Sequence, residues 1–342
     1  MLKRMNRIVH NTIGRIKYLY HSVKPHPQND DKVSGNISYI NWWAGDPDTF
    51  WFSHFFRNTL KNRSAKIEMY SLFGSPGKLK RTGNSVKIFF TGENVEEFSC
   101  SSRYSDIYSV KKEGRRHREY GDYGGKNVDL ALGFGLKRAE NYIRFPLWIL
   151  YIIDPVLDKT AIQNNLDRIN ALHNDFHGTK DAALFARHDK FGTRSEIYFA
   201  LKDLIQIDCP SKYQHNTDED FITDKLTFLR NYKFNICPEN VDSPGYVTEK
   251  LMEAFASGTI PIYLGSTGYL EPDVVNPEAV LVWNLDGDNS QVIQKILRLQ
   301  SDENYYREFC KIPKFVPGAA DAIYDKMNEL ADRVNKLAET RR

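Results

Sequence analysis

The chain has 342 residues, with 47 Lys and Arg against 44 Asp and Glu, and a formal net charge of +3. This near balance argues against a dedicated nucleic-acid-binding protein, and the length favours two domains of ordinary size. The 4 cysteines lie far apart and have no metal-binding spacing, which favours reduced thiols. No apolar run is long enough to span a bilayer, so we expect a cytoplasmic protein.

Residues 1–35 are predicted to form a basic amphipathic helix and a linker. The first 24 residues contain 6 Lys and Arg and no acid, and their apolar residues recur at helical spacing. Such a helix can lie peripherally on the anionic inner face of the cytoplasmic membrane, or it can pack against protein. Both interpretations stay open.

Residues 36–150 are predicted to form a first α/β domain, in which apolar strands alternate with helical segments. A polar stretch at 95–127, rich in Arg, Lys and Tyr, interrupts the pattern and has the character of an insertion. It is either a solvated mobile loop or a part of an acceptor site. The strands are expected at 36–42, 66–72, 86–90 and 128–134, and a helix at 49–60.

A carboxylate follows the strand at 86–90. Thr91-Gly92-Glu93-Asn94 ends this strand, so Glu93 lies in a loop at its carboxyl end, where a general base can stand. A turn carboxylate in water is the alternative, and Glu96 and Glu97 are equally eligible neighbours.

Paired aspartates of the D-x-D pattern occur at 46–48, 218–220 and 286–288. Some glycosyltransferases hold a divalent metal in this way. The pattern arises easily by chance, and Pro47 favours a plain turn or helix start. We therefore predict no metal site.

Residues 151–317 are predicted to form a second α/β domain, followed by a C-terminal helix at 318–342. Its clearest part is 233–265, which reads strand, turn, helix, strand and so predicts a right-handed βαβ unit in a parallel sheet. Val247, Leu251 and Phe255 recur every four residues and should face a core, and Gly258 should end the helix.

Two helix starts in this domain carry a cation. Lys250 lies in the first turn of a helix that begins between 244 and 248, and Arg194 lies in TRSE at 193–196, which predicts a capping box. Helix starts already attract anions, so a phosphate between such a start and its cation is one interpretation. The alternative is a solvated Lys250 that pairs with Glu253. A diphosphate at the carboxyl edge of one sheet would satisfy both cations.

The segment 234–265 also resembles a known family. Phe234, Cys237, Glu239 and Asn240, then GYVTEK at 245–250 and the strand GTIPIYLG at 258–265, are similar to the signature of glycosyltransferase family 10, the α-1,3/4-fucosyltransferases. Thr91-Gly92-Glu93-Asn94 and RFPL at 144–147 match further elements of the family. The resemblance covers roughly 37–265 in pieces and points to a bacterial-type member.

The resemblance implies a GT-B fold, in which two Rossmann-like doubly wound domains face one another across a cleft. The first domain would bind the acceptor and the second GDP-β-L-fucose, and inverting transfer would place α-linked fucose on O3 or O4 of GlcNAc in a LacNAc-type glycan of the Lewis kind. Glu93 would be the base, and Arg194 and Lys250 would hold the diphosphate without a metal cofactor. The family pattern also places three residues in the donor site: Asn240, Tyr246 and Glu249. Glu239 matches the motif without an assigned contact.

Two other functions stay open from the sequence. A related enzyme of the same fold could use another nucleotide sugar, and a non-catalytic protein could bind the glycan or the nucleotide sugar without forming a product. The presence of Glu93, Arg194 and Lys250 together argues against the second.

Overall fold

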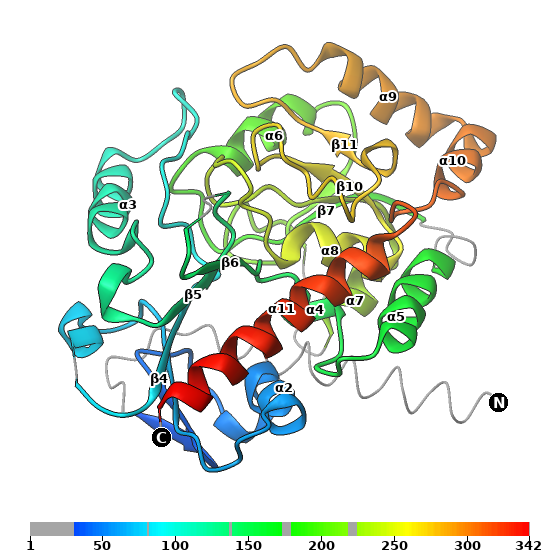
Figure 1. Cartoon of the computed structure of the whole chain (residues 1–342). Coiled ribbons are helices and arrows are strands. Elements are labelled where there is room, and N and C mark those ends of the chain that lie inside the picture. The colour runs from blue at the N-terminus through cyan, green and yellow to red at the C-terminus, as the bar shows by residue number, and fades with distance from the viewer. Residues whose placement is uncertain (1–30, 81, 137–138, 173–178, 218–223, 342) are drawn as a thin grey trace. The chain divides into compact units, whose positions relative to one another are not determined.

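A computed structural model describes residues 31–80, 82–136, 139–172, 179–217 and 224–341 (Figure 1). The chain divides into two compact units, and neither is continuous in sequence. The first unit comprises the described residues up to Val95, Arg116–Ile162 and the described residues from Asp321 onward. The second comprises Glu96–Arg115 and the described residues between Gln163 and Ala320. Residues 1–24, predicted as a basic helix, lie outside the described residues.

In the first unit, the described residues form a six-stranded sheet in the order β1-β2-β3-β4-β5-β6. β1 pairs antiparallel with β2, and every later pair is parallel. Strand follows strand in chain order, so this sheet has no point at which its direction of growth reverses. The strands are Lys32–Ser34, Ile37–Ile40, Ile67–Tyr70, Val86–Phe90, Leu130–Gly133 and Tyr142–Arg144.

In the second unit, the described residues form a five-stranded parallel sheet in the order β11-β10-β9-β7-β8. The chain moves from β7 outward to β8 and then returns to place β9 on the other side of β7. The growth of the sheet therefore reverses between β7 and β9, where α/β sheets of this kind bind ligands. The strands are Lys180–Leu184, Ile207–Asp208, Tyr232–Ile236, Ile260–Tyr263 and Leu281–Val282.

A helix or a 3-10 turn lies between most consecutive parallel strands of both units (Figure 1). Within the first unit or at its boundaries lie α2 (Trp51–Thr59), α3 (Ile107–Tyr120), α4 (Ile149–Ile152), α5 (Lys159–Ala171) and α11 (Ala319–Thr340). The second unit contains α6 (Thr193–Leu201), α7 (Lys225–Leu229), α8 (Glu249–Ser257), α9 (Ser290–Ser301) and α10 (Glu303–Cys310). Short 3-10 turns are η1 (Pro47–Thr49), η2 (Pro76–Lys80), η3 (Gly125–Asn127) and η4 (Pro277–Ala279).

The β9-α8-β10 segment confirms the predicted βαβ unit. β9 and β10 pair in parallel, with Phe234 opposite Ile260. Val247, Leu251 and Phe255 are buried, as their spacing predicted. Gly258 ends α8 in the left-handed conformation, at φ 81°, which glycine adopts without steric cost.

The structure differs from the expected segmentation in three places. The expected linker ends earlier, because Lys32–Ser34 forms β1. The stretch 95–127 is not an irregular loop: it contains α3, and Tyr120 packs in the core against Phe89 at a ring distance of 5.8 Å. The C-terminal helix groups with the first unit, where the side chain of Asn335 accepts from Lys61 N and donates to Thr59 O.

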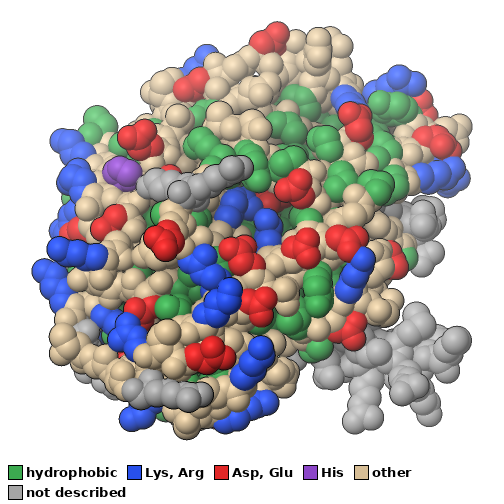
Figure 2. All heavy atoms as spheres, viewed as in Figure 1, with side chains coloured by type: hydrophobic (Ala, Val, Ile, Leu, Met, Phe, Trp, Pro, Cys, Tyr) green, Lys and Arg blue, Asp and Glu red, His purple; other side chains and the backbone are tan. Residues whose placement is uncertain are grey.

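The surface carries both signs of charge. Figure 2 shows Lys and Arg interspersed with Asp and Glu over the visible face, in keeping with the near-balanced composition. Among the described residues, no helix combines the length and the apolar character needed to cross a membrane.

Candidate functional site

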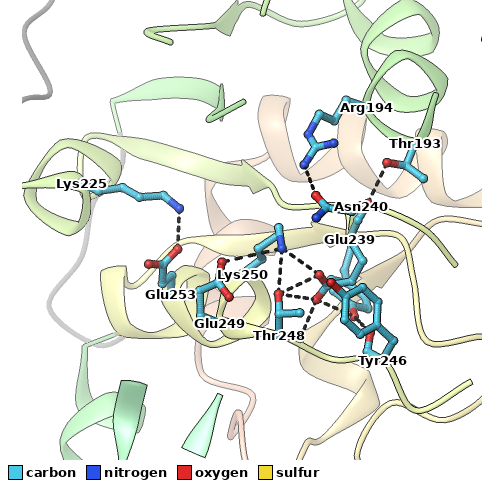
Figure 3. A network of polar contacts seen from close by, with 11 residues as sticks. Thr193, Arg194, Lys225, Glu239, Asn240, Tyr246, Thr248, Glu249, Lys250 and Glu253 are labelled. Atoms are coloured by element: carbon cyan, nitrogen blue, oxygen red, sulfur yellow. Dashed lines mark hydrogen bonds and ion pairs between the residues drawn. The ribbon is translucent and has the colours of Figure 1, made fainter. Parts of the chain in front are cut away.

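Two loops of the second unit meet at the reversal of its sheet. β7 ends at Leu184 and leads to α6, while β9 ends at Ile236 and leads to α8. Since β7 and β9 are hydrogen-bonded neighbours, the loops that follow them lie side by side at the carboxyl edge. Thr193 Oγ1 donates a 2.7 Å hydrogen bond to Glu239 O and joins the two loops directly (Figure 3).

Arg194 extends from the first turn of α6 toward the second loop. Its Nη2 donates to Asn240 Oδ1 at 2.7 Å (Figure 3). Its Nη1 lies 3.8 Å from Asp189 Oδ1. The side chain is only 7% exposed, yet within the described residues neither Nη1 nor Asp189 Oδ1 has a hydrogen-bond partner. Burial lowers the pKa of Arg194, which Asp189 and Glu239 oppose. The guanidinium thus has a buried N–H donor that makes no hydrogen bond within the described residues.

The predicted capping box at TRSE is wrong. Gly192, in the left-handed conformation at φ 76°, is the N-cap, so α6 begins at Thr193. The hydroxyl of Thr193 is consequently free to bond the neighbouring loop, and Ser101 Oγ donates to Glu196 Oε2 at 3.2 Å. The capping acceptor comes from outside the motif, because Ser195 N donates to Asp189 Oδ2 at 2.6 Å.

Glu239 is the centre of the second loop, and its side chain is fully buried. Its carboxylate accepts from Thr248 N at 2.7 Å, which is the amide at the start of α8. Thr248 Oγ1, Lys250 Nζ and the hydroxyl of Tyr263 also donate to it, at 2.7, 2.9 and 3.2 Å (Figure 3). Sequence reasoning placed Glu239 in the motif without a contact, and the structure makes it the acceptor that fixes the start of this helix.

Lys250 points into this network and not into water. Its Nζ lies 2.9 Å from Glu239 Oε2 and 3.7 Å from Glu249 Oε1, and the side chain is 19% exposed. Burial alone would lower the pKa of Lys250, but the nearby carboxylates of Glu239 and Glu249 outweigh it and raise the pKa above its ordinary value. The lysine is therefore a permanent ammonium at the start of α8.

The alternative interpretation, a pair of Lys250 with Glu253, is wrong, because Glu253 has another partner. Glu253 forms a short ion pair with Lys225 of α7, and its side chain is 4% exposed. Lys225 lies on the neighbouring helix, so tertiary contact wins over the local i, i+3 pairing. Burial raises the pKa of Glu253, whereas the two lysines Lys250 and Lys225 lower that of Glu249 against the effect of burial. The pKa values of these two carboxylates are therefore shifted in opposite directions.

Tyr246 precedes the start of α8 and is 2% exposed. Its carbonyl oxygen accepts from the Tyr263 hydroxyl at 3.4 Å, and its backbone N–H donates to Ser243 O. The structure thus brings five sequence-predicted residues into one region of the second unit: Arg194, Asn240, Tyr246, Glu249 and Lys250.

Glu93 belongs to the first unit, in the loop after β4. Thr91 Oγ1 accepts from Glu93 N at 3.0 Å and holds the turn, and a side chain at Gly92 would meet Leu147 within 2.7 Å. The Glu93 carboxylate is 27% exposed and lies 3.5 Å from Arg116 Nη1. The two other carboxylates that the sequence offered as a base, Glu96 and Glu97, group with the second unit and not with the first.

The paired aspartates have structural roles where they are described. Asp46 caps η1 by accepting from Asp48 N, which confirms the expected helix start. Asp286 accepts from Ser102 N at 3.0 Å, and Asp288 accepts from Ser290 N at 2.9 Å. The pair at 218–220 lies outside the described residues. Across the part of the chain that the structure describes, no group of three or more His, Cys, Asp and Glu side chains could hold a metal ion.

Two family models match the chain. One, described as "Glycosyltransferase family 10 (fucosyltransferase) C-term", matches residues 179–339. The other, described as "Alpha-(1,3)-fucosyltransferase FucT N-terminal domain", matches residues 37–151. Together they cover most of both units.

Curated relatives match over shorter or longer parts. The chain is 26% identical over 307 residues to an alpha-(1,3)-fucosyltransferase, FucT, of Helicobacter pylori, covering 79% of this chain and 58% of that protein. It is 31% identical over 96 residues to an alpha-(1,4)-fucosyltransferase of Arabidopsis thaliana, covering 28% of this chain and 23% of that protein. The chain therefore matches less than two thirds of the length of each of these relatives.

Solved structures share the fold. A crystal structure of an alpha1,3-fucosyltransferase with GDP has a TM-score of 0.54 at 21% identity, covering 89% of this chain and 94% of that one. One with GDP-fucose has a TM-score of 0.53 at 20% identity, covering 93% and 97%. At such identities the likeness shows the fold, which is the GT-B type predicted from the sequence.

Proposed function

Because this chain belongs to glycosyltransferase family 10, we propose that it is an inverting fucosyltransferase. It transfers L-fucose from GDP-β-L-fucose to O3 or O4 of GlcNAc in a LacNAc-type glycan. One observation carries the donor half of the proposal. Arg194 and Lys250, both largely buried, start two helices at the reversal of a parallel sheet, which is where such sheets bind nucleotides.

The donor is held through its diphosphate. Arg194 Nη1 is a buried donor that has no hydrogen-bond partner in the described residues. An ammonium has three N–H groups, of which Lys250 directs two at Glu239 and Thr248. The first N–H groups of α8 add their partial positive charge. These groups neutralise charge that develops on the leaving diphosphate, so the reaction proceeds without a metal. Asn240, Tyr246 and Glu249 complete the donor site.

The acceptor hydroxyl needs a base, and we assign this role to Glu93. Transfer with inversion is a single displacement through an oxocarbenium-like transition state, in which a carboxylate removes the proton of the attacking hydroxyl. Glu93 suits the role because its carboxylate is partly exposed and its loop is held by Thr91 and Gly92. The side chain is therefore not needed to form the turn.

Product analysis tests donor, stereochemistry and linkage together. Purified protein is incubated with GDP-fucose and lactosamine isomers, and the product is analysed by NMR; we expect α-linked fucose on O3 or O4 of GlcNAc. Transfer from another nucleotide sugar alone would assign a different donor. Binding of GDP-fucose without any product would show a non-catalytic protein.

Residues 1–24 add a proposal that rests on sequence alone. Their acid-free basic helix contacts anionic lipid at the cytoplasmic face of the membrane. Deleting them should abolish salt-sensitive sedimentation with anionic vesicles and leave transfer to soluble acceptors largely intact. Equal sedimentation of both proteins would refute it.

A further inference from the structure

The cations of the donor site already have anionic partners inside the protein. Lys250 lies beside Glu239 and Glu249, and Arg194 lies beside Asp189. Among these groups, three carboxylates face two cations. A nucleotide diphosphate would bring still more negative charge, so at least one carboxylate must oppose its binding.

Of these carboxylates, Glu239 makes the closest contact with Lys250 and also contacts the start of α8. It contacts the Lys250 ammonium at 2.9 Å, closer than Glu249 at 3.7 Å. It also accepts from Thr248 N, an amide at a helix start, which is the kind of donor that binds phosphate in other α/β proteins. In Figure 3 its carboxylate lies beside Thr248 and Lys250. Glu239 thus fills an anion position at the start of α8.

Resting on the proposed donor site, we propose that Glu239 is an internal counter-anion to Lys250, and that its charge also acts directly on the nucleotide bound there. It stabilises the donor-free protein by neutralising a largely buried ammonium and by fixing the start of α8. The same charge weakens the binding of the nucleotide. A phosphate oxygen that accepts from the third N–H of Lys250 would lie roughly 5 Å from the Glu239 oxygen that accepts from another N–H of the same ammonium, and the two negative charges repel.

The repulsion distinguishes product from substrate. The terminal phosphate of GDP ionises twice near neutral pH, so GDP carries about one more negative charge than a GDP-sugar, whose outer phosphate is esterified. Glu239 therefore opposes GDP more than GDP-fucose. It promotes release of the product at the end of each turnover.

Four proteins test this by calorimetric titration with GDP: wild type, Glu239→Gln, Lys250→Met and the double variant. Glutamine keeps the size of the side chain and removes its charge, so we expect Glu239→Gln to bind GDP about tenfold more tightly. The gain for GDP-fucose should be smaller, and GDP should inhibit turnover more strongly. Without nucleotide the variant should melt at a lower temperature, and GDP should raise that temperature more than in wild type.

Glu253→Gln is the matched control. Its carboxylate is also buried and ion-paired, but with Lys225. It should lower stability and leave GDP affinity unchanged, because it does not contact Lys250 in the described network. A merely structural role of Glu239 would give the same result for both variants.

The comparison of Lys250→Met with the double variant tests the inference even if the single variant Glu239→Gln does not fold. In Lys250→Met the carboxylate of Glu239 stays beside the phosphate, and in the double variant it is gone, so the double variant should bind GDP about tenfold more tightly than Lys250→Met. Equal affinities in this pair, or unchanged or weaker GDP binding by folded Glu239→Gln, would overturn the inference. Failure of wild type to bind GDP would overturn the proposed donor site itself, and this inference with it.

Discussion

The two loops that carry the candidate chemistry are held in different ways. In the first unit, the loop 91–94 is fixed by Thr91 Oγ1 and by the close approach of Gly92 to Leu147, and Glu93 extends from it partly exposed. In the second unit, the loop between β9 and α8 is fixed by the functional side chains, because Glu239 and Lys250 bond one another and the start of the helix.

This difference separates two kinds of functional residue. A partly exposed side chain that does not hold its turn together can be changed at little cost in stability, so its loss mainly affects the chemical step. A side chain in a buried network of opposite charges cannot be removed without leaving a partner unpaired. Affinity and stability should therefore change together in the second unit and separately in the first.

The largest expected effect tests the first loop. Glu93→Gln keeps the shape but cannot accept a proton, so kcat should fall about 10²- to 10⁴-fold, the usual contribution of a general base. GDP affinity and melting temperature should stay close to those of wild type. Steady-state kinetics, calorimetry and thermal melting measure all three.

Glu97→Gln serves as the control for Glu93, since Glu97 is an exposed carboxylate of the second unit. It should turn over normally. Normal turnover by Glu93→Gln would place the base elsewhere and break the comparison.

The next effect tests the second unit. Arg194→Ala removes a charge-assisted contact worth roughly 1.5 to 3 kcal/mol, so GDP should bind about tenfold to more than hundredfold more weakly. Because Asp189 is 2% exposed and loses its cation, unfolding should also become easier by about 1 to 3 kcal/mol. Calorimetry and denaturant unfolding report the two changes.

Arg187→Ala, an exposed arginine of the same loop, should alter neither quantity. If Arg194→Ala binds GDP as tightly as wild type, the guanidinium belongs to the fold alone.

A third buried cation, Lys314, differs from Arg194 and Lys250 because it donates to backbone carbonyl oxygens. Lys314 is fully buried and donates to Ile169 O at 2.6 Å and to Asn170 O at 3.3 Å. Burial lowers the pKa of Lys314 to about 7, whereas carboxylates raise that of Lys250. The unfolded state binds more protons at Lys314 above pH 7, so this group makes stability rise with pH.

The free energy of unfolding should therefore increase between about pH 7 and 8.5, by up to roughly 1.4 kcal/mol per pH unit from this one proton. Denaturant unfolding at several pH values measures the slope, and Lys314→Met should flatten it. An equal slope in both proteins would contradict this assignment.

The smallest expected effect concerns metal. If Arg194 and Lys250 neutralise the diphosphate, turnover should survive EDTA with little loss. Asp48→Asn, at an exposed turn aspartate that pairs with Arg57, should also retain activity. Complete dependence on added Mn²⁺ or Mg²⁺ would return attention to the paired aspartates.

Local sequence determined much of the secondary structure of this protein. β4 occupies Val86–Phe90 as its apolar run predicted, and α8 starts after Thr248 and ends at Gly258 as its turn residues predicted. These features depend on neighbours a few residues apart, so periodicity and turn chemistry suffice to predict them. The sequence also identified the motif residues that the structure places together in the second unit, among them Arg194, Asn240 and Lys250.

Only the tertiary structure decided how those residues are paired. Local rules predicted a capping box at 193–196 and offered a pair of Lys250 with Glu253 as one interpretation, but the structure has contacts across the fold in place of both. Glu239 bonds Thr248, nine residues away, and Tyr263, 24 residues away. Such contacts exist only once β9, α8 and β10 have packed together, because a buried carboxylate bonds the donors that the fold brings to it, whatever their distance in sequence.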